Sequence, residues 1–142
     1  MLSHVLIAVD GSPPSRHAAR FGLSLAEQLD ARATLLTVLH KPEVIPLGPM
    51  ATSVVTSGPT EAELESLRGG LDAIANEHPA LNVQRVIELG QVAETIIEWA
   101  GKNQVDLIVV GARGLGPARR FLLGSISDRI VHHAHCPVTV WR

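Results

Sequence analysis

The sequence has few aromatic residues and a single cysteine. Two Phe, two Trp and no Tyr occur among 142 residues, so the core must be aliphatic, and a platform of stacked aromatic rings for single-stranded nucleic acid is not expected. Cys136 has no second cysteine to pair with, which excludes an internal disulfide. Its position before Pro137 favours a buried small hydrophobic residue over a nucleophile. The cysteine content therefore offers no argument for secretion.

An excess of charge of one sign and long apolar runs are also lacking. Lys and Arg number 12 against 14 Asp and Glu, a formal net charge of -2, so no bulk attraction to nucleic acid or to an anionic membrane follows. No apolar stretch approaches the length of a membrane span, and residues 1–4 carry no basic region ahead of a signal-type apolar run. We therefore expect a cytoplasmic protein with no nucleic-acid and no membrane partner.

What the sequence does contain is a regular alternation of strand and helix patterns. Short apolar runs that indicate buried strands alternate with stretches of helical periodicity. The strands are predicted at 4–10, 33–39, 82–89, 105–110 and 137–141, and the helices at 13–29, 61–77, 90–100 and 124–134. Ser12 and Pro13 predict the cap and first position of the first helix. We predict one domain, residues 1–142, of the α/β class: an open five-stranded parallel sheet with helices on both faces, Rossmann-like.

Residues 41–59 interrupt this alternation. Proline and glycine recur through the segment and break any helical period. Because a connection of this length without regular structure is uncommon in a compact domain, we expect a long loop, and we favour a flexible connector over a functional lid. In the helix that follows, Gly69 and Gly70 each cost roughly 1 kcal/mol relative to Ala, which predicts the weakest helix of the fold.

Ligands of open parallel sheets bind beyond the carboxyl ends of the strands, which narrows the search for a site. Three such ends carry polar or glycine residues: 10–12, 38–40 and the glycine- and arginine-rich stretch 111–125. Glycine in the third stretch lets the backbone approach a ligand closely. The helix that begins near Gly124 attracts an anion such as phosphate through its free N–H groups and its dipole.

The same stretch carries positive charge but matches neither of two common phosphate motifs. Arg113 lies in the loop itself, whereas Arg119 and Arg120 either add to its charge or form a solvated face. The stretch is not a Walker A loop, because no Lys follows the second glycine of a G-x-x-x-x-G pair, and it is not a dinucleotide fingerprint.

The spacing Gly111-x2-Gly114-x9-Gly124-Ser125 is similar to the nucleotide-binding signature of the universal stress protein family. Segments 5–12, 106–114, 122–127 and 135–140 resemble the same family, in the same order along the chain. The resemblance implies strand order 3-2-1-4-5, a homodimer and, in many members, ATP held in the cleft between the first and fourth strands.

The resemblance also implies roles for individual residues. The adenine and ribose would be bordered by Ala8, Val9, Asp10 and Val38, and the phosphates would be held by Gly111, Arg113, Gly114, Gly124, Ser125, Ile126 and Ser127. The candidate set is completed by Gly11, Ser12, Ala112 and Gly116. Asp10 has two alternatives, a divalent metal such as Mg beside the phosphates or a helix cap without a ligand, and Ser125 is also a candidate N-cap. Pro117 stands where a small flexible residue is more usual, and it stiffens the loop.

Other residues indicate neither a catalytic nor a metal site. His132, His133 and His135 lie at a predicted helix C-terminus, where a basic residue is favourable, and adjacent histidines on a helix point in different directions. Neither paired carboxylates nor a Ser-His-Asp arrangement can be assembled from the spacing, so an enzyme is not indicated.

The last predicted strand, 137–141, lies at an edge of the sheet with unpaired backbone groups. Pairing with its own copy across a two-fold axis would satisfy them, in agreement with the homodimer that the resemblance implies. Two functions remain open: a cytoplasmic stress-response regulator that binds ATP with little or no hydrolysis, and a nucleotide-free dimeric interaction module of the same fold.

Overall fold

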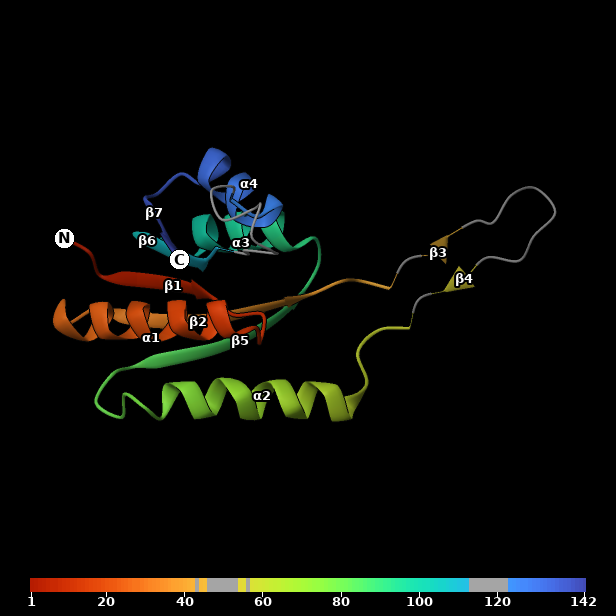
Figure 1. The fold of residues 1–142 in the computed structure, drawn as a ribbon, viewed down its shortest axis with the longest axis horizontal. Coiled ribbons are helices and arrows are strands. Elements are labelled where there is room, and N and C mark those ends of the chain that lie inside the picture. Colours follow the sequence, from red (N-terminus) through yellow and green to blue (C-terminus); the bar gives the residue numbers. More distant parts are fainter. Residues whose placement is uncertain (43, 46–53, 56, 113–122) are drawn as a thin grey trace.

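The chain folds into an alternating series of strands and helices (Figure 1). The computed structural model describes residues 1–42, 44–45, 54–55, 57–112 and 123–142. The strands are β1 (His4–Ala8), β2 (Arg32–Leu39), β3 (Val44–Ile45), β4 (Val54–Val55), β5 (Val83–Leu89), β6 (Leu107–Gly111) and β7 (Val138–Trp141). The helices are α1 (Pro13–Gln28), α2 (Glu61–Ala75), α3 (Val92–Lys102) and α4 (Ser125–His133). All predicted strands and helices are present, with boundaries shifted by a few residues.

Five of the strands form one parallel sheet in the order β5-β2-β1-β6-β7. Counted along the chain without β3 and β4, this is the order 3-2-1-4-5, so the predicted fold class and topology are confirmed. Helices α1 and α2 cover one face of the sheet, and α3 and α4 cover the other (Figure 1). The strand order reverses between β1 and β6, which places the expected ligand position at their carboxyl ends.

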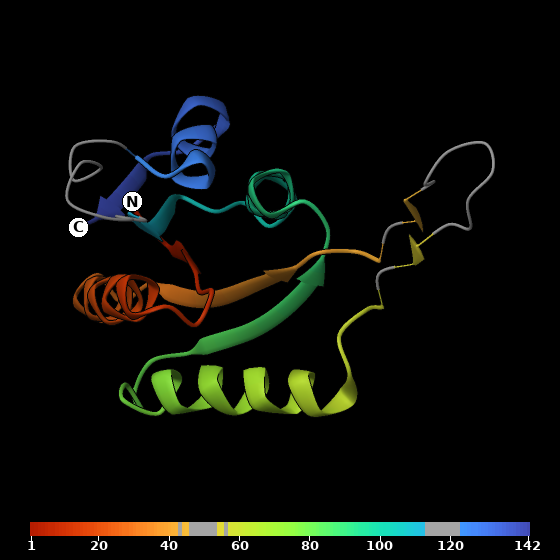
Figure 2. The same ribbon diagram turned by 45° about the vertical axis from the view of Figure 1, so that its right-hand side comes forward.

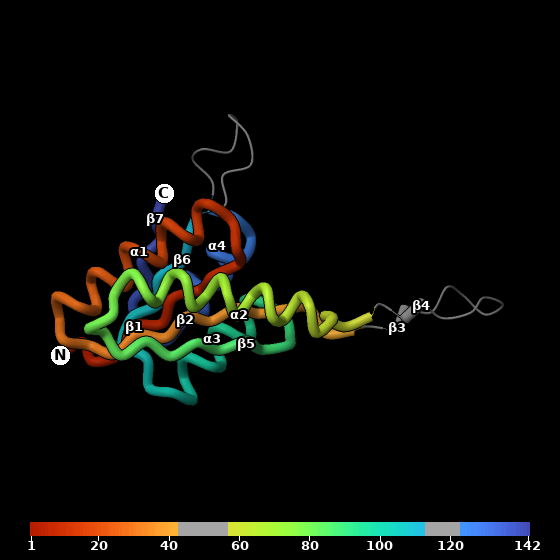
Figure 3. Tube along the Cα trace, turned by 90° about the horizontal axis from the view of Figure 1, so that it is seen from below, coloured from red at the N-terminus to blue at the C-terminus, as the bar shows by residue number. Residues whose placement is uncertain are grey.

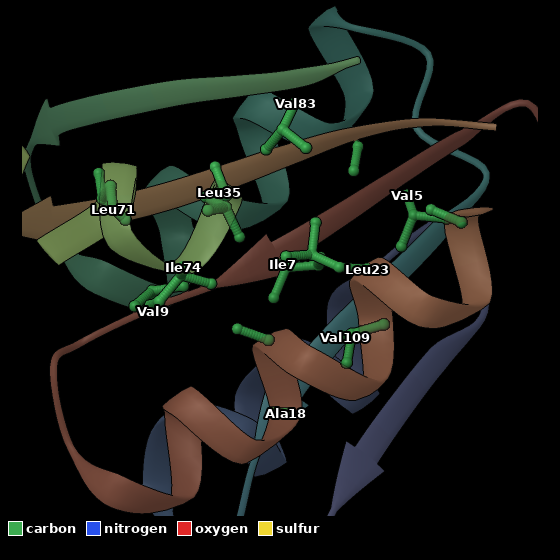
Figure 4. Close-up of a cluster of buried hydrophobic side chains, with 14 of the residues drawn as sticks. Val5, Ile7, Val9, Ala18, Leu23, Leu35, Leu71, Ile74, Val83 and Val109 are labelled. Atoms are coloured by element: carbon green, nitrogen blue, oxygen red, sulfur yellow. The ribbon is translucent and has the colours of Figure 1, made fainter. Parts of the chain in front are cut away.

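Alternate residues of the central strands pack into two aliphatic cores. In β1, Val5 and Ile7 pack toward α1 and α2 while Leu6 packs toward α3 and α4, and all three are fully buried. Figure 4 shows the first of these cores between the sheet and its helices. Because both faces of each central strand are covered, the strands are apolar throughout rather than alternating. The prediction of an aliphatic core is confirmed.

Local sequence signals set the helix starts. Ser12 is the N-cap of α1, its hydroxyl accepts a hydrogen bond from the Ser15 N–H at 3.4 Å, and Pro13 follows as predicted. At α4 the N-cap is Gly124, so the alternative that Ser125 caps the helix is wrong. Within the described ranges, none of the helices is long and apolar enough to cross a membrane.

Residues 41–59 contain regular structure, and the expectation of a connection without any is wrong. Val44 and Ile45 of β3 pair antiparallel with Val55 and Val54 of β4. Each half of the pair is a dipeptide of β-branched residues, which favour extended backbone. The prolines and glycines around them masked this signal in the sequence. Residues 43, 46–53 and 56 lie outside the described ranges.

His4 is buried near the amino-terminal end of β1. Its Nδ1 lies 3.2 Å from the Asn103 carbonyl oxygen and its Nε2 lies 2.9 Å from the Thr34 hydroxyl. Burial lowers the pKa of His4. A neutral ring satisfies both contacts, because the carbonyl can only accept: Nδ1–H donates to Asn103, and Nε2 accepts the hydroxyl proton of Thr34. Nearby, hydrogen bonds from the Ser3 backbone and side chain lower the pKa of Asp106.

The free edge of β5 is partly covered by a side chain of the same strand. The Gly90 N–H donates to the Leu39 carbonyl, so even-numbered residues pair with β2 and odd-numbered residues of β5 turn their N–H and C=O groups outward. Arg85 donates from its guanidinium to the outward carbonyl of Val83 at 2.7 Å and pairs with Asp72 at 3.0 Å. A bulky cation on an edge strand hinders pairing with another chain.

At the opposite edge of the sheet, none of the described strands pairs with the outer side of β7. The Ala112 N–H donates to the Trp141 carbonyl at 2.7 Å, which fixes the odd-numbered residues of β7 toward β6. Val138 and Val140 therefore turn their N–H and C=O groups away from the sheet. Their side chains are half-buried, and among the described residues no segment covers the outward backbone groups.

Candidate functional site

A cavity of about 300 Å³ lies at the carboxyl ends of β1, β2 and β6. Ten predicted site residues line it: Ala8, Val9, Asp10, Ser12, Val38, Gly111, Gly124, Ser125, Ile126 and Ser127. Gly11 and Ala112 lie beside lining residues without lining the cavity themselves. The remaining predicted positions, Arg113, Gly114 and Gly116, lie outside the described residues. The sequence-predicted strand ends thus converge on one hollow, at the place where open parallel sheets bind ligands.

The turn between β1 and α1 forms one wall of the cavity and is held by its own hydrogen bonds. Gly11 has a φ of +80°, which favours glycine, and the Ser12 N–H donates to Asp10 Oδ1 at 2.9 Å. The Ser15 hydroxyl donates to the Ser12 carbonyl at 3.0 Å and accepts from the Asp10 N–H at 3.2 Å. Because Ser12 is the N-cap of α1, the alternative that Asp10 itself caps the helix is wrong.

The end of β2 presents backbone polar groups to the cavity. The Val9 N–H donates to the Leu36 carbonyl at 2.9 Å, so even-numbered residues of β2 face β1. β1 ends at Ala8, which pairs with Leu36. The strand therefore stops two residues short of the position that would pair with Val38. The N–H and C=O groups of Val38 therefore point past the end of β1, and the described residues offer neither of them a hydrogen bond.

The first turn of α4 forms the wall opposite. Its N-cap, Gly124, has no side chain to accept the free N–H groups of the helix, and no side chain among the described residues caps them. These N–H groups belong to Ser125, Ile126 and Ser127, all of which line the cavity. An uncapped helix N-terminus on a cavity is an anion-binding arrangement, because both the N–H groups and the helix dipole favour negative charge.

Gly111 joins these walls at the end of β6. Its carbonyl accepts a hydrogen bond from the Ser127 hydroxyl at 3.0 Å, which ties α4 to the strand. A Cβ at position 111 would lie 3.0 Å from the backbone C and O of Pro14 at the start of α1. Only glycine lets α1 and β6 approach this closely without displacement, so the backbone of Gly111 sets the spacing between two walls of the cavity.

Several lining residues were not predicted from the sequence. They are Pro14, Ser15, Leu36, Thr37, Leu39, His40, Leu67, Val92, Ile96, Val110 and Ile130. Most of them are core residues of β2, α3, β6 and α4. Their helical or strand periodicity in the sequence indicates that they are buried, but not that they line a cavity. Thr37, which is buried, donates its hydroxyl proton to the Val9 carbonyl at 2.8 Å and is thereby occupied. Asp10 and His40 are the titratable side chains of the described lining.

A larger hollow, of about 410 Å³, lies between the end of β5 and α3 and shares His40 with the first. Its lining carries three carboxylates, Glu88, Glu94 and Glu98, and two lysines, Lys41 and Lys102, so its charge does not attract a phosphate. No group of three or more His, Cys, Asp or Glu side chains able to hold a metal occurs in the described part of the chain. The smaller cavity lies where the strand order reverses and contains the predicted site residues, so it is the better candidate for a ligand.

The fold and this cavity define a Rossmann-like α/β protein with its site at the strand ends. A model of the universal stress protein family matches residues 1–142. A universal stress protein of Methanocaldococcus jannaschii is 30% identical to the chain over 136 residues, which cover 96% of the chain and 79% of that protein. The chain therefore belongs to the universal stress protein family, and the resemblance stated from its motifs is confirmed.

Solved structures of this family share the fold. The universal stress protein UspA from Lactobacillus plantarum superposes with a TM-score of 0.77 at 22% identity, over 99% of this chain and 97% of that one. A universal stress protein in complex with cAMP gives 0.74 at 19% identity, over 99% and 96%. A family member from Arabidopsis thaliana with AMP bound gives 0.64 at 20% identity, over 98% and 90%.

Proposed function

We propose that this protein binds an adenine nucleotide, ATP, in the cavity at the carboxyl ends of β1, β2 and β6, and acts in the cytoplasm as a stress-response regulator. One observation carries the proposal: the outward N–H and C=O of Val38 and the uncapped first turn of α4 line the same cavity. The backbone groups of Val38 suit hydrogen bonds to a base, and the free N–H groups of α4 suit a phosphate. The single cysteine, Cys136, fits a reducing compartment.

The end of β2 would hold the base. Adenine presents an acceptor, N1, next to a donor, the N6 amino group, and Val38 offers one donor and one acceptor in an extended backbone. Aliphatic side chains from Ala8, Val38 and Ile126 line the cavity on the side of α3 and α4, so the ring would lie against methyl groups rather than on another ring. The complexes of similar proteins with cAMP and AMP support adenine as the base.

The first turn of α4 would hold phosphate oxygens. The net charge of the chain is -2, so the attraction for a polyphosphate has to be local, from the N–H groups of α4 and the backbone beside Gly111. Arg113, Gly114 and Gly116 extend this proposal along the segment that follows β6. The hydroxyl of Ser125, which is exposed at the first helical position, adds one more donor.

Asp10 would hold a magnesium ion that arrives with the nucleotide. Mg²⁺ is commonly bound through one or two carboxylates together with substrate phosphates, and one carboxylate in the cavity lining fits that requirement. When bound, the ion would neutralise phosphate charge. We propose that the nucleotide is hydrolysed slowly or not at all, because general-base catalysis needs a base held against the attacking water, and the single carboxylate of the described lining, Asp10, would already be bound to the magnesium ion.

The direct test is to identify what the purified protein carries. Mass spectrometry and 260 nm absorbance of material released by denaturation should show ATP or AMP at close to one molecule per chain, and calorimetry on the stripped protein should show ATP binding. A protein that is empty and does not bind ATP contradicts the proposal, and the nucleotide-free dimeric interaction module becomes the better description.

A pair of substitutions tests the phosphate site separately. Ser125→Glu places a negative charge at the first turn of α4 without harming the helix, which favours acidic residues there, and Ser125→Gln has the same size without the charge. We expect the Glu variant to bind ATP at least about tenfold more weakly than the Gln variant, since two charges a few Å apart repel strongly. Adenosine should bind both alike. Equal ATP affinities would contradict the placement of the phosphates.

We also propose that two copies of the protein pair through β7. Val138 and Val140 each turn one N–H and one C=O outward, and across a two-fold axis these groups can pair antiparallel with those of a second copy. Arg85 hinders the same association at the β5 edge. Of the two edge strands of the sheet, β7 is therefore the one that we propose pairs with a second copy.

The substitution Val140→Pro removes one outward donor while the residues that pair with β6 keep theirs. The matched control, Val140→Thr, keeps both the donor and β-branching. In size-exclusion chromatography with light scattering, we expect dimers for the wild type and the control, and monomers for the proline variant. A proline variant that still runs as a dimer would rule out pairing through this strand.

A further inference from the structure

The candidate cavity includes one side chain from α2, a helix that otherwise packs on the face of the sheet shared with α1. Helix α2 runs antiparallel to β5, so its N-terminal half lies toward the carboxyl ends of the strands (Figure 2). There Leu67, which is half-buried, reaches the cavity lining. Seen from below, the same half of the helix extends toward β3 and β4 (Figure 3). A ligand in the cavity would therefore touch α2 through Leu67.

The two halves of α2 are anchored very differently. Its buried residues, Leu71, Ile74 and Ala75, all follow Gly69 and Gly70. The half that precedes the glycines, residues 61–68, has no buried residue and packs through two half-buried leucines at positions 64 and 67. Nothing lies within 4 Å of a Cβ added at either glycine, so both glycines weaken the helix without serving a close contact.

Local interactions hold residues 61–68 only weakly. The start of the helix has a capping box, in which the Glu63 N–H donates to the Thr60 hydroxyl at 3.2 Å and the Thr60 N–H donates to the Glu63 carboxylate at 2.7 Å. The Arg68–Glu61 ion pair, at 2.9 Å, is exposed and contributes little. Residues 61–68 continue from the anchored half of α2 across two glycines, each of which disfavours the helix by about 1 kcal/mol, so the contact of Leu67 with its surroundings matters for the whole segment.

We infer that nucleotide binding orders residues 61–68 and, through them, residues 57–60, which lead into the helix. The inference rests on the proposed function. A nucleotide in the cavity covers the exposed part of Leu67, and the apolar contact favours the helical form of the segment over locally unfolded forms. The chain that leads into this segment, residues 57–60, is then held in one position in the bound state and in several in the free state.

The coupling must act in both directions. If part of the free protein has residues 61–68 unfolded, that part binds nucleotide poorly, and the observed affinity is reduced by the unfolded fraction. Substitutions that favour the helix should therefore increase the affinity without touching the ligand. Gly69→Ala with Gly70→Ala is such a change, because neither position contacts the cavity and neither has a close neighbour.

Hydrogen exchange with mass spectrometry, on the full chain with and without saturating ATP, tests the inference. Amides of residues 64–68 should exchange at least about fivefold more slowly with ATP, whereas residues 71–75 should not change. Slower exchange of the amides in the first turn of α4 shows independently that ATP has bound. Protection at α4 without protection at 64–68 would overturn the inference and leave the proposed function standing. Protection at neither place would overturn both.

Two sets of variants sharpen the result. Leu67→Ala should lose the ATP-dependent protection of residues 64–68 while still binding ATP, and Leu64→Ala, which lies on the same helix outside the cavity lining, should keep it. The Gly69→Ala, Gly70→Ala double variant should be protected before ATP is added and should bind ATP roughly three- to tenfold more tightly. Equal ATP affinity and unchanged exchange in the double variant would contradict the inference.

Discussion

Gly22 lies in the middle of α1, where the helix crosses β1 and β6. A Cβ added there would lie 2.8 Å from both Cγ1 and Cδ1 of Ile7 and 3.5 Å from Cβ of Val109. Ile7 and Val109 are both fully buried, so neither can move without displacing its own neighbours. Overpacking of this kind costs about 1–3 kcal/mol. The gain from replacing a helical glycine by Ala is about 1 kcal/mol, so Gly22→Ala should lower the free energy of unfolding by up to about 2 kcal/mol.

Thermal and urea unfolding of matched alanine variants measure this prediction. Gly69→Ala is the control, because the same substitution in an exposed helix position without neighbours should raise the free energy of unfolding by about 1 kcal/mol. Gly69→Ala should therefore raise Tm by about 3 °C, whereas Gly22→Ala should not raise Tm and should lower it by up to about 6 °C. Adding Ile7→Val, which removes Cδ1, should recover part of any loss in Gly22→Ala. A Gly22→Ala protein that is stabilised as much as Gly69→Ala would refute the packing argument.

Three further substitutions have defined outcomes. Because the pKa of His4 is lowered from 6.5, the unfolded chain binds its proton first, so stability decreases as the pH falls below about 6.5, by at most about 1.4 kcal/mol per pH unit. In His4→Gln, denaturation curves at several pH values should lack this component. Gly111→Ala forces β6 away from the backbone of Pro14 and should weaken ATP binding in calorimetry as well as stability, by about 1–3 kcal/mol for stability. Thr60→Ala breaks the capping box and should cost about 1 kcal/mol in unfolding experiments.

The main sheet could be predicted because four of its strands are short apolar runs between helical patterns, and the fifth, β5, alternates around Val83, Val86 and Ile87. His4 to Ala8, for example, has no polar face, as a strand covered on both sides requires. The pair β3 and β4 was missed because two-residue strands are too short to show a period, and the prolines nearby outweighed them. Ser125 is a candidate for the cap of α4 in the sequence because a serine signals a cap more strongly than a glycine does, and the structure places Gly124 there.

The candidate site was only partly accessible from the sequence, since the strand ends and the first turn of α4 can be read from glycines and polar residues but the contribution of α2 cannot. Leu67 fits the apolar period of a helix and indicates only burial, and it enters the cavity because α2 runs antiparallel to β5. The role of Val38 depends on register, because a shift of one residue would turn its N–H and C=O toward β5. Neither fact is encoded by residue type.

The guanidinium of Arg85 on the carbonyl of Val83 has a consequence for assembly. If both edge strands of a sheet can pair with other copies, molecules can be added at both edges without limit, which produces a filament. A sheet with only one edge strand free to pair can bind one further copy, so the assembly stops at two molecules. We expect Arg85→Thr to leave the β5 edge free to pair as well. The variant should then form oligomers larger than a dimer, and their size should increase with protein concentration. One side chain on the far side of the molecule would then set the size of the assembly.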